Sequence, residues 1–236
     1  MASIRVLPDV VANRIAAGEV VERPESIVKE LIENALDAGA DDIRVLLKNG
    51  GKSGITVIDN GCGMGFDDAL LAFERHATSK IHDEQDLVLV KTLGFRGEAL
   101  PSIASVTRLT MATKEAGSDE PGTIVQITGG VVKNVTRAPL DPGTRIEISS
   151  LFFNVPARRK FLKKTETEYA RILRIMISYA LANPDIAFTL SHDGKQTARF
   201  DHRHQLEDRI REVLGADFST GTATSAGVSV ACYLLP

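Results

Sequence analysis

Apolar residues recur with the period of an amphipathic helix in residues 24–38. The apolar positions are Ile27, Val28, Leu31, Ile32, Ala35 and Leu36. Pro24 suits the first helical turn, where its missing N–H is not needed, and Gly39 suits the left-handed position just after a helix. The pattern therefore predicts a helix with one buried face and well-marked ends.

Strands are predicted where apolar and polar residues alternate. Residues 43–47 and 55–57 alternate on either side of a Gly- and Asn-rich turn, which is typical of an antiparallel hairpin. Further strand patterns cover residues 108–114, 123–128, 131–137, 145–151, 187–191 and 197–200. Helical patterns cover residues 66–77, 169–181 and about 205–214. These elements predict an α+β fold.

The character of the chain changes after residue 202. A charged helix is followed by a Gly/Ser/Thr-rich segment, 215–227, which predicts a loop, and then by one apolar strand. At about 150 residues per domain, the 236 residues favour one complete domain plus part of another. We therefore expect a first domain at residues 1–202, with an N-terminal arm of about 20 residues, and the beginning of a second domain at residues 203–236.

Composition narrows the class of protein. A hydrophobic content of 43%, a charged content of 25% and a net charge of −3 predict a globular chain and exclude a disordered or collagen-like one. Cys62 and Cys232 are too few for a disulfide framework, and charged residues interrupt every apolar stretch near the start. The apolar run at residues 175–182 is too short to span a membrane. We expect a cytoplasmic protein without a membrane partner.

Charge is distributed unevenly. Residues 1–42 hold four Lys or Arg against nine Asp or Glu, whereas residues 157–174 hold seven against two. Within the second region, the basic stretch from Arg158 to Lys164 has the Lys/Arg density that contacts with nucleic-acid phosphates need. An inter-domain contact or a solvated linker would have the same composition, so these interpretations remain open.

The polar side of the first helix carries a candidate site. At 100° per residue, Glu30, Asn34 and Asp37 share a narrow strip beside the apolar face. The strip is either an ordinary solvated face or a functional one. In the functional case Asn34 offers an oxygen to a hard cation, and Glu30 offers a carboxylate that can position or deprotonate water.

A glycine-rich turn follows the predicted strand that ends near Asp59. Glycines at Gly61, Gly63 and Gly65 allow positive φ and a close approach of a ligand to the backbone. Their spacing does not match a dinucleotide-binding fingerprint. Asp59 either caps the N–H groups of a tight turn or accepts a hydrogen bond from an exocyclic amine such as that of adenine. The pattern alone does not decide between the two.

A second glycine-rich segment is a candidate phosphate cradle. Its residues are Gly94, Phe95, Arg96, Gly97, Glu98, Ala99 and Leu100. Backbone N–H groups of such a loop, leading into a helix, can bind an anion. An ordinary surface loop would show the same sequence pattern. Thr78, Ser79 and Lys80 add two hydroxyls and a cation, or simply end a helix. Residues 51–53 lack the earlier glycine of a P-loop and predict only a turn.

Four short motifs follow one another along the chain: Glu30-x-x-x-Asn34, Asp59-x-Gly61-x-Gly63, residues 94–100 and Gly143-Thr144. In this order they resemble the GHKL ATPases, which comprise gyrase, heat-shock chaperones, histidine kinases and MutL. The run Gly-Phe-Arg-Gly-Glu-Ala-Leu resembles the signature of the MutL mismatch-repair family, as do residues 15–21, 75–80 and 154–162. The resemblance covers residues 3–200.

The resemblance implies the GHKL, or Bergerat-type, fold. This fold is a two-layer sandwich in which helices cover one face of a mixed, mostly antiparallel sheet. In MutL proteins an α/β transducer domain follows, and we expect the chain to end inside it.

The resemblance also implies roles for single residues. Glu30 matches the general base that activates water, and Asn34 matches the ligand of Mg²⁺. Asp59 matches the acceptor of the adenine amine, and Thr144 a residue that supports it. An O6 carbonyl facing Asp59 would leave a buried carboxylate unpaired, so adenine should be preferred over guanine.

The remaining candidate residues match the surroundings of the nucleotide. Gly61 and Gly63 match the turn beneath the base, and Asp37 lies on the same helix strip as Glu30. A further group of residues matches the family's lid over the phosphates: Thr78, Ser79, Lys80, Gly94, Phe95, Arg96, Gly97, Glu98, Ala99 and Leu100. ATP and Mg²⁺ are the implied cofactors.

The implied function is ATP binding and slow hydrolysis that drive a conformational cycle in DNA mismatch repair. The implied partners are DNA, a mismatch-recognition ATPase, a nicking endonuclease or helicase, and a second copy of the chain in an ATP-dependent homodimer. The alternative is a nucleotide-gated binding module that binds ATP without hydrolysing it. MutL-like enzymes complete their site with a transducer-domain lysine that has no identifiable counterpart here.

Overall fold

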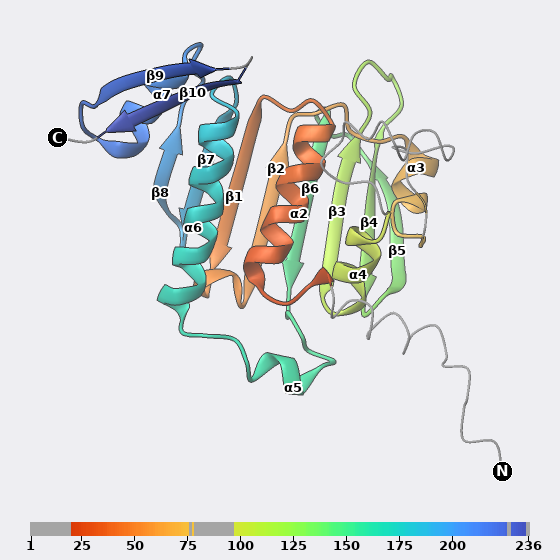
Figure 1. Cartoon of the computed structure of the whole chain (residues 1–236). Coiled ribbons are helices and arrows are strands. Elements are labelled where there is room, and N and C mark those ends of the chain that lie inside the picture. The colour runs from red at the N-terminus through yellow and green to blue at the C-terminus, as the bar shows by residue number, and fades with distance from the viewer. Residues whose placement is uncertain (1–19, 76, 78–96, 226–227, 235–236) are drawn as a thin grey trace.

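An eight-stranded sheet forms the centre of the computed structural model, which describes residues 20–75, 77, 97–225 and 228–234 (Figure 1). The strands are β1 (Asp42–Lys48), β2 (Gly54–Asp59), β3 (Arg108–Lys114), β4 (Gly122–Thr128), β5 (Val131–Ala138), β6 (Gly143–Ser149), β7 (Ala187–His192) and β8 (Lys195–Phe200). Their spatial order is β5-β4-β3-β6-β2-β1-β7-β8. Only the β1–β7 pair of this sheet is parallel, so the sheet is mixed and mostly antiparallel, as predicted.

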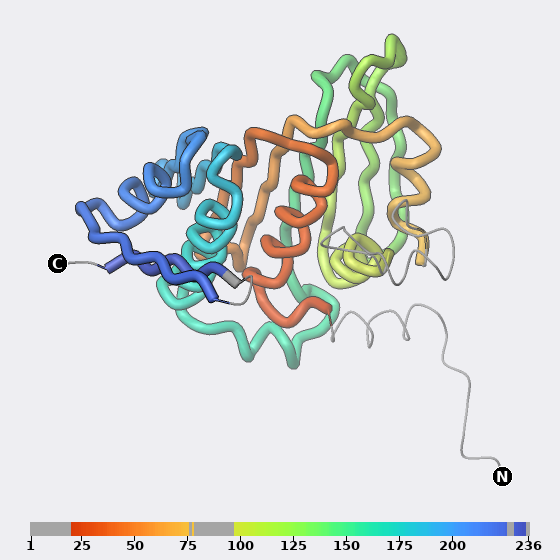
Figure 2. The backbone as a smooth tube through the Cα atoms, turned by 45° about the horizontal axis from the view of Figure 1, so that its top comes forward, coloured from red at the N-terminus to blue at the C-terminus, as the bar shows by residue number. Residues whose placement is uncertain are grey.

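Helices cover one face of this sheet (Figures 1 and 2). They are α2 (Pro24–Asp37), α3 (Phe66–Leu71), α4 (Ala99–Ser105) and α6 (Thr165–Ala182), with the short η1 (Asn49–Gly51) and α5 (Pro156–Arg159) in connections. In β1 the side chains of Ile43, Val45 and Leu47 are buried, whereas their neighbours on the other face are exposed. The core therefore lies between the sheet and the helices, and the two-layer prediction is confirmed.

Helices α2 and α6 lie side by side and are joined by polar contacts. The Tyr179 hydroxyl of α6 donates to Oε1 of Glu33 on α2 at 2.6 Å, and Arg171 Nη1 of α6 lies 3.1 Å from Glu25 Oε1 on α2. Burial, followed by the hydrogen bond to Glu33, raises the pKa of Tyr179 above its ordinary value. The contact with Tyr179 thus fixes the rotation of α2 about its axis and with it the direction of the other α2 side chains.

The predicted helix at residues 66–77 is shorter than expected. α3 ends at Leu71, and after Ala72 the N–H groups of Phe73 and Glu74 bond to carbonyls only three residues back. Bonds of this type tighten and end a helical turn. The other helix and strand predictions hold to within a few residues at each end.

The segment after residue 202 contains α7 (Leu206–Leu214) and a two-stranded sheet of β9 (Ser219–Ser225) and β10 (Val228–Leu234). The prediction of a loop was wrong for residues 219–225, because their alternate threonines suit a strand and β10 pairs with them along its length. Arg209 of α7 is fully buried and donates to the carbonyls of Pro184 and Ile186. The domain boundary near residue 202 stays a prediction.

Among the described residues, no helix is long and apolar enough to cross a membrane.

Candidate functional site

Glu30 and Asn34 lie one turn apart on α2, rotated about the helix axis from Glu33 by about 60° and 100°. Glu33, which contacts Tyr179, fixes the direction of α6, and residues one and four positions apart on a helix differ by about 100° and 40°. Glu30 is partly buried, with 27% of its side chain exposed, and lies 3.6 Å from Lys29 Nζ. Burial lowers the pKa of Lys29, but the hydrogen bond to Glu33 and the charges of Glu30 and Glu33 outweigh it, so this pKa is raised.

The turn after β2 is pressed against the end of α2. The Cys62 N–H donates to the Ala38 carbonyl at 2.9 Å, and a Cβ added to Gly61 would lie 2.8 Å from both the Cβ and the carbonyl oxygen of Ala38. Gly63 has a φ of +62°, and a Cβ there would overlap the carbonyl of Lys114. Both positions therefore lack room for a side chain, and Gly63 also has a positive φ that favours glycine.

Asp59 lies at the base of this turn and acts as an acceptor. Its Oδ1 accepts the Gly61 N–H at 3.0 Å, and the Thr144 N–H also bonds to the carboxylate. Burial raises the pKa of Asp59 and outweighs these two backbone donors, which lower it. The half-buried carboxylate is thus held in place while its ionised form is disfavoured.

Thr144 is brought to Asp59 by the register of the sheet. Asp59 on β2 lies opposite Thr144 on β6, which lies opposite Thr113 on β3. The hydroxyls of Thr113 and Thr144 are 3.0 Å apart, and the Met64 N–H donates to Thr113 Oγ1 at 3.0 Å. Sequence reasoning found Asp59 and Thr144 but missed Thr113, because nothing in its local pattern separates it from other strand threonines.

The described part of the second glycine-rich segment leads into α4. Glu98 occupies the N-cap position, Ala99 and Leu100 form the first turn, and the Ser102 N–H donates to the Glu98 carbonyl at 3.0 Å. Gly97 packs its backbone against Ala77. The helix that the sequence expects after this loop is present. The remaining candidate residues lie outside the described residues: Thr78, Ser79, Lys80, Gly94, Phe95 and Arg96.

Asp37 ends α2, one turn beyond Asn34 and next to Ala38. It therefore lies at the end of the helix that the glycine turn touches. Within the part of the chain that the structure describes, no group of three or more His, Cys, Asp or Glu could hold a metal ion by itself.

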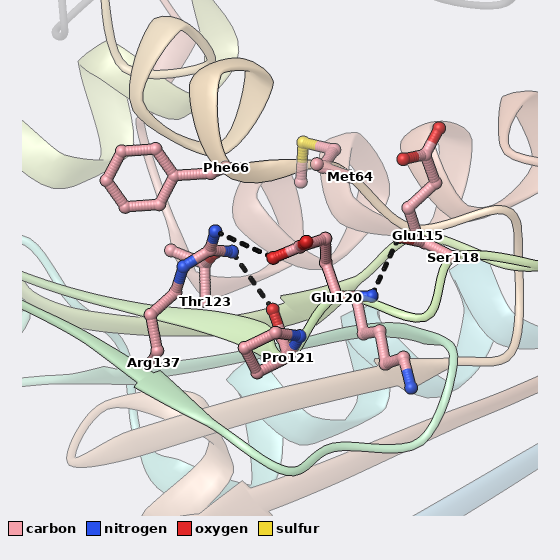
Figure 3. Close-up of a pocket in the computed structure, with 10 residues that line it drawn as sticks. Met64, Phe66, Glu115, Ser118, Glu120, Pro121, Thr123 and Arg137 are labelled. Carbon is pink, nitrogen blue, oxygen red and sulfur yellow. Dashed lines mark hydrogen bonds and ion pairs between the residues drawn. The ribbon is translucent and has the colours of Figure 1, made fainter.

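A small cavity of about 170 Å³ lies behind the glycine turn, lined by Met64, Phe66 and residues of the β3–β4 connection (Figure 3). Arg137 reaches into it from β5. Its guanidinium carbon lies 4.6 Å from the centre of the Phe66 ring, and Nη1 donates to the Pro121 carbonyl at 3.0 Å. This cation therefore fastens the first residue of α3 to the edge of the sheet.

Comparison with known proteins decides the family. Residues 21–151 match the family described as histidine kinase-, DNA gyrase B-, and HSP90-like ATPase. The solved Aquifex aeolicus MutL ATPase domain complexed with ADP matches with a TM-score of 0.72 and 33% identity, over 86% of this chain and 73% of that one. The chain belongs to this ATPase family and, within it, to MutL.

Full-length MutL proteins extend well beyond this chain. The DNA mismatch repair protein MutL of Trichlorobacter lovleyi is 56% identical over 83% of this chain and 33% of its own length. That of Citrifermentans bemidjiense is 48% identical over 99% of this chain and 34% of its own length. The chain therefore spans about a third of the MutL relatives that it matches.

The space requirement at Gly63 gives a test of the glycine turn. Gly63→Ala should lower the free energy of unfolding by about 3 kcal/mol or more, since Ala pays for positive φ and also displaces the Lys114 backbone. Gly117→Ala is the matched control, because Gly117 also has positive φ but nothing within 4 Å of an added Cβ. It should cost about 1–2 kcal/mol. Denaturant unfolding measures both, and equal losses would contradict the steric account.

Proposed function

We propose that this MutL chain binds ATP with Mg²⁺ along the edge of α2 and hydrolyses it slowly, as part of a conformational cycle in DNA mismatch repair. The observation that carries the proposal is the contact of the Asp59 turn with the C-terminal end of α2, at Ala38. Asn34 is one turn and Glu30 two turns further along this helix. A nucleotide whose base lies at Asp59 therefore extends its phosphates past Asn34 towards Glu30.

The base end fits adenine. Asp59 presents a half-buried carboxylate that already accepts two backbone N–H groups, and an exocyclic amine supplies the further donor that a partly buried acceptor favours. The ADP-complexed MutL domain from Aquifex aeolicus supports a nucleotide at this fold. The absence of a side chain at Gly61 and Gly63 keeps the turn flat against its neighbours.

The phosphate end combines Glu30 with the start of α4. Glu30 is proposed to orient and deprotonate the attacking water, which is general-base chemistry. The backbone of Gly97, Glu98, Ala99 and Leu100 is proposed to face the terminal phosphate, together with the lid residues outside the described part. Pro101 has no N–H, so the donors of this first turn are confined to the residues before it.

The donor set fits Mg²⁺ better than a metal bound by protein alone. Mg²⁺ retains waters and is commonly held by one or two side-chain oxygens plus substrate phosphates. Asn34 supplies such an oxygen, and the described residues hold no ligand cluster that would capture a metal without nucleotide. When bound, Mg²⁺ neutralises phosphate charge during transfer.

We also propose that the basic stretch from Arg158 to Lys164 contacts DNA. Its Arg159, Lys160, Lys163 and Lys164 are exposed, and Phe161 among them has 75% of its surface exposed. An exposed aromatic ring between cations is the arrangement that stacks bases and neutralises phosphates in single-stranded nucleic acid. This placement favours the DNA interpretation over a solvated linker.

The remaining partners follow from membership of MutL. We propose that the chain forms an ATP-dependent homodimer through the N-terminal arm and the transducer domain. We also propose that it engages the mismatch-recognition ATPase and a nicking endonuclease or helicase, and that it is cytoplasmic. The competing function is a module that binds ATP without turnover. If the chain only binds ATP, Glu30→Gln has no effect on hydrolysis.

Glu30→Gln should lower single-turnover ATP hydrolysis by about a hundredfold or more, while ATP affinity stays within a factor of about two. The carboxamide keeps the shape of the side chain but cannot accept the proton. Glu33→Gln is the control three residues away, since its carbonyl can still accept the Tyr179 hydrogen bond. Loss of turnover in both variants, or in neither, would remove Glu30 from the catalytic role.

Asn34→Ala should raise the Mg²⁺ concentration needed for half-maximal ATP binding by about tenfold. ADP affinity measured in chelator should remain unchanged, because the base contacts do not involve Asn34. Titration calorimetry at fixed nucleotide measures both quantities. Asn134→Ala, at an exposed position of β5, is the control. An unaltered metal dependence would exclude Asn34 as the ligand.

Lys160→Glu combined with Lys163→Glu should weaken binding of a single-stranded oligonucleotide and reduce the salt dependence of that binding by about one to two units of slope. Phe161→Ala should weaken binding with an unchanged slope, because stacking carries no charge. Lys133→Glu with Lys195→Glu gives the same charge change on edge strands β5 and β8. Fluorescence anisotropy at several salt concentrations distinguishes these variants. Equal effects of the two double Lys→Glu variants would contradict a local DNA contact.

A further inference from the structure

Thr113 carries a buried hydroxyl that has no assigned role in the proposed nucleotide site. Its side chain lies on β3 with 1% of the residue exposed, between the glycine turn and Thr144. Its Oγ1 has three polar neighbours. The Met64 N–H donates to it at 3.0 Å, the Gly143 carbonyl is 3.1 Å away, and the Thr144 hydroxyl is 3.0 Å away.

A hydrogen count orders these three contacts. A threonine hydroxyl has one hydrogen and two lone pairs, and the Met64 N–H occupies one lone pair. The Gly143 carbonyl can only accept, so the Thr113 hydrogen must go to it if that contact is to be a hydrogen bond. The second lone pair of Thr113 then takes the hydrogen of Thr144. This is the one arrangement in which all three contacts are hydrogen bonds, and buried polar groups are rarely left unpaired.

We infer that Thr113 is a positioning residue that fixes the Thr144 hydroxyl as a hydrogen-bond acceptor towards the base and so makes the site selective for an exocyclic amine. This inference rests on the proposed binding of an adenine nucleotide. Thr113 does not face the nucleotide itself. It acts by accepting the hydrogen of the Thr144 side chain, which is the only hydrogen that this hydroxyl could donate.

The consequence is an edge of the site that only accepts. Asp59 takes two backbone N–H groups and presents acceptor oxygens, and Thr144 adds lone pairs beside them. An amine, or a water that donates on its behalf, satisfies such an edge. A carbonyl at the same position, as in hypoxanthine or guanine, would face acceptors alone and leave them unpaired.

The test compares the affinities of the full chain for ADP and inosine diphosphate, which differ in this group and in the hydrogen that hypoxanthine carries on N1. Thr113→Val keeps the shape and removes the hydroxyl, so the Thr144 hydrogen becomes free to donate to a carbonyl. The preference for ADP over inosine diphosphate should fall by about tenfold. Thr113→Ser should retain it. Thr123→Val is the control, since Thr123 lies opposite Thr113 on β4, is also 1% exposed, and has its hydroxyl 3.4 Å from Arg137.

The preference ratio separates selectivity from simple loss of structure. If Thr113→Val weakens both nucleotides equally, Thr113 only supports the fold and the inference is wrong. If that variant does not fold, Thr113→Cys gives the same comparison, because a thiol is a much weaker donor and acceptor. A wild-type chain that binds neither nucleotide would overturn the proposed function itself, whereas tight ADP binding with an unchanged ratio in the variants would overturn this inference alone.

Discussion

The close packing of the glycine turn at residues 61–63 is the constraint on which the site depends. The backbone of Cys62 donates to Ala38 at the end of α2 and accepts from Ala116 just after β3, at 2.9 and 2.8 Å. The turn therefore joins the helix layer to the sheet at one point. Its Cys62 side chain is exposed, so the backbone rather than the side chain makes this connection. An added Cβ at Gly61 would collide with Ala38 at the end of α2, and one at Gly63 would collide with the Lys114 backbone at the end of β3.

Helix α2 divides its polar residues between two tasks because the turn and α6 hold it from different sides. Glu25 and Glu33 pair with Arg171 and Tyr179 of α6, which fixes the rotation of the helix about its axis. Glu30 and Asn34 lie about 60° and 100° around the helix from Glu33. Residues one position apart thus serve packing and proposed chemistry, and rotating the helix would disturb both together.

The sequence predicts the elements of this fold far better than the distances between them. Hydrophobic periodicity locates α2 and the hairpin of β1 and β2, because these patterns depend on neighbours within a few residues. Thr113 escapes such reasoning, because its importance comes from pairing with Thr144, which is fixed by sheet register over a long sequence separation. Thr144 itself was found through resemblance alone. The β9 strand was missed for a related reason, since its polar threonines suit a strand only once β10 lies beside them.

The energetics of Asp59 connect the fold to the proposed ligand. Because its pKa is raised in the folded chain, the folded state binds the proton more tightly than the unfolded state, so ionisation at neutral pH reduces stability. That cost is present above the raised pKa and disappears below the ordinary pKa of an aspartate. A ligand amine that donates to the carboxylate offsets it, and the offset is available only when the ligand is bound. A site that disfavours its own charge in the absence of nucleotide therefore gains binding selectivity from the same burial that weakens the free protein.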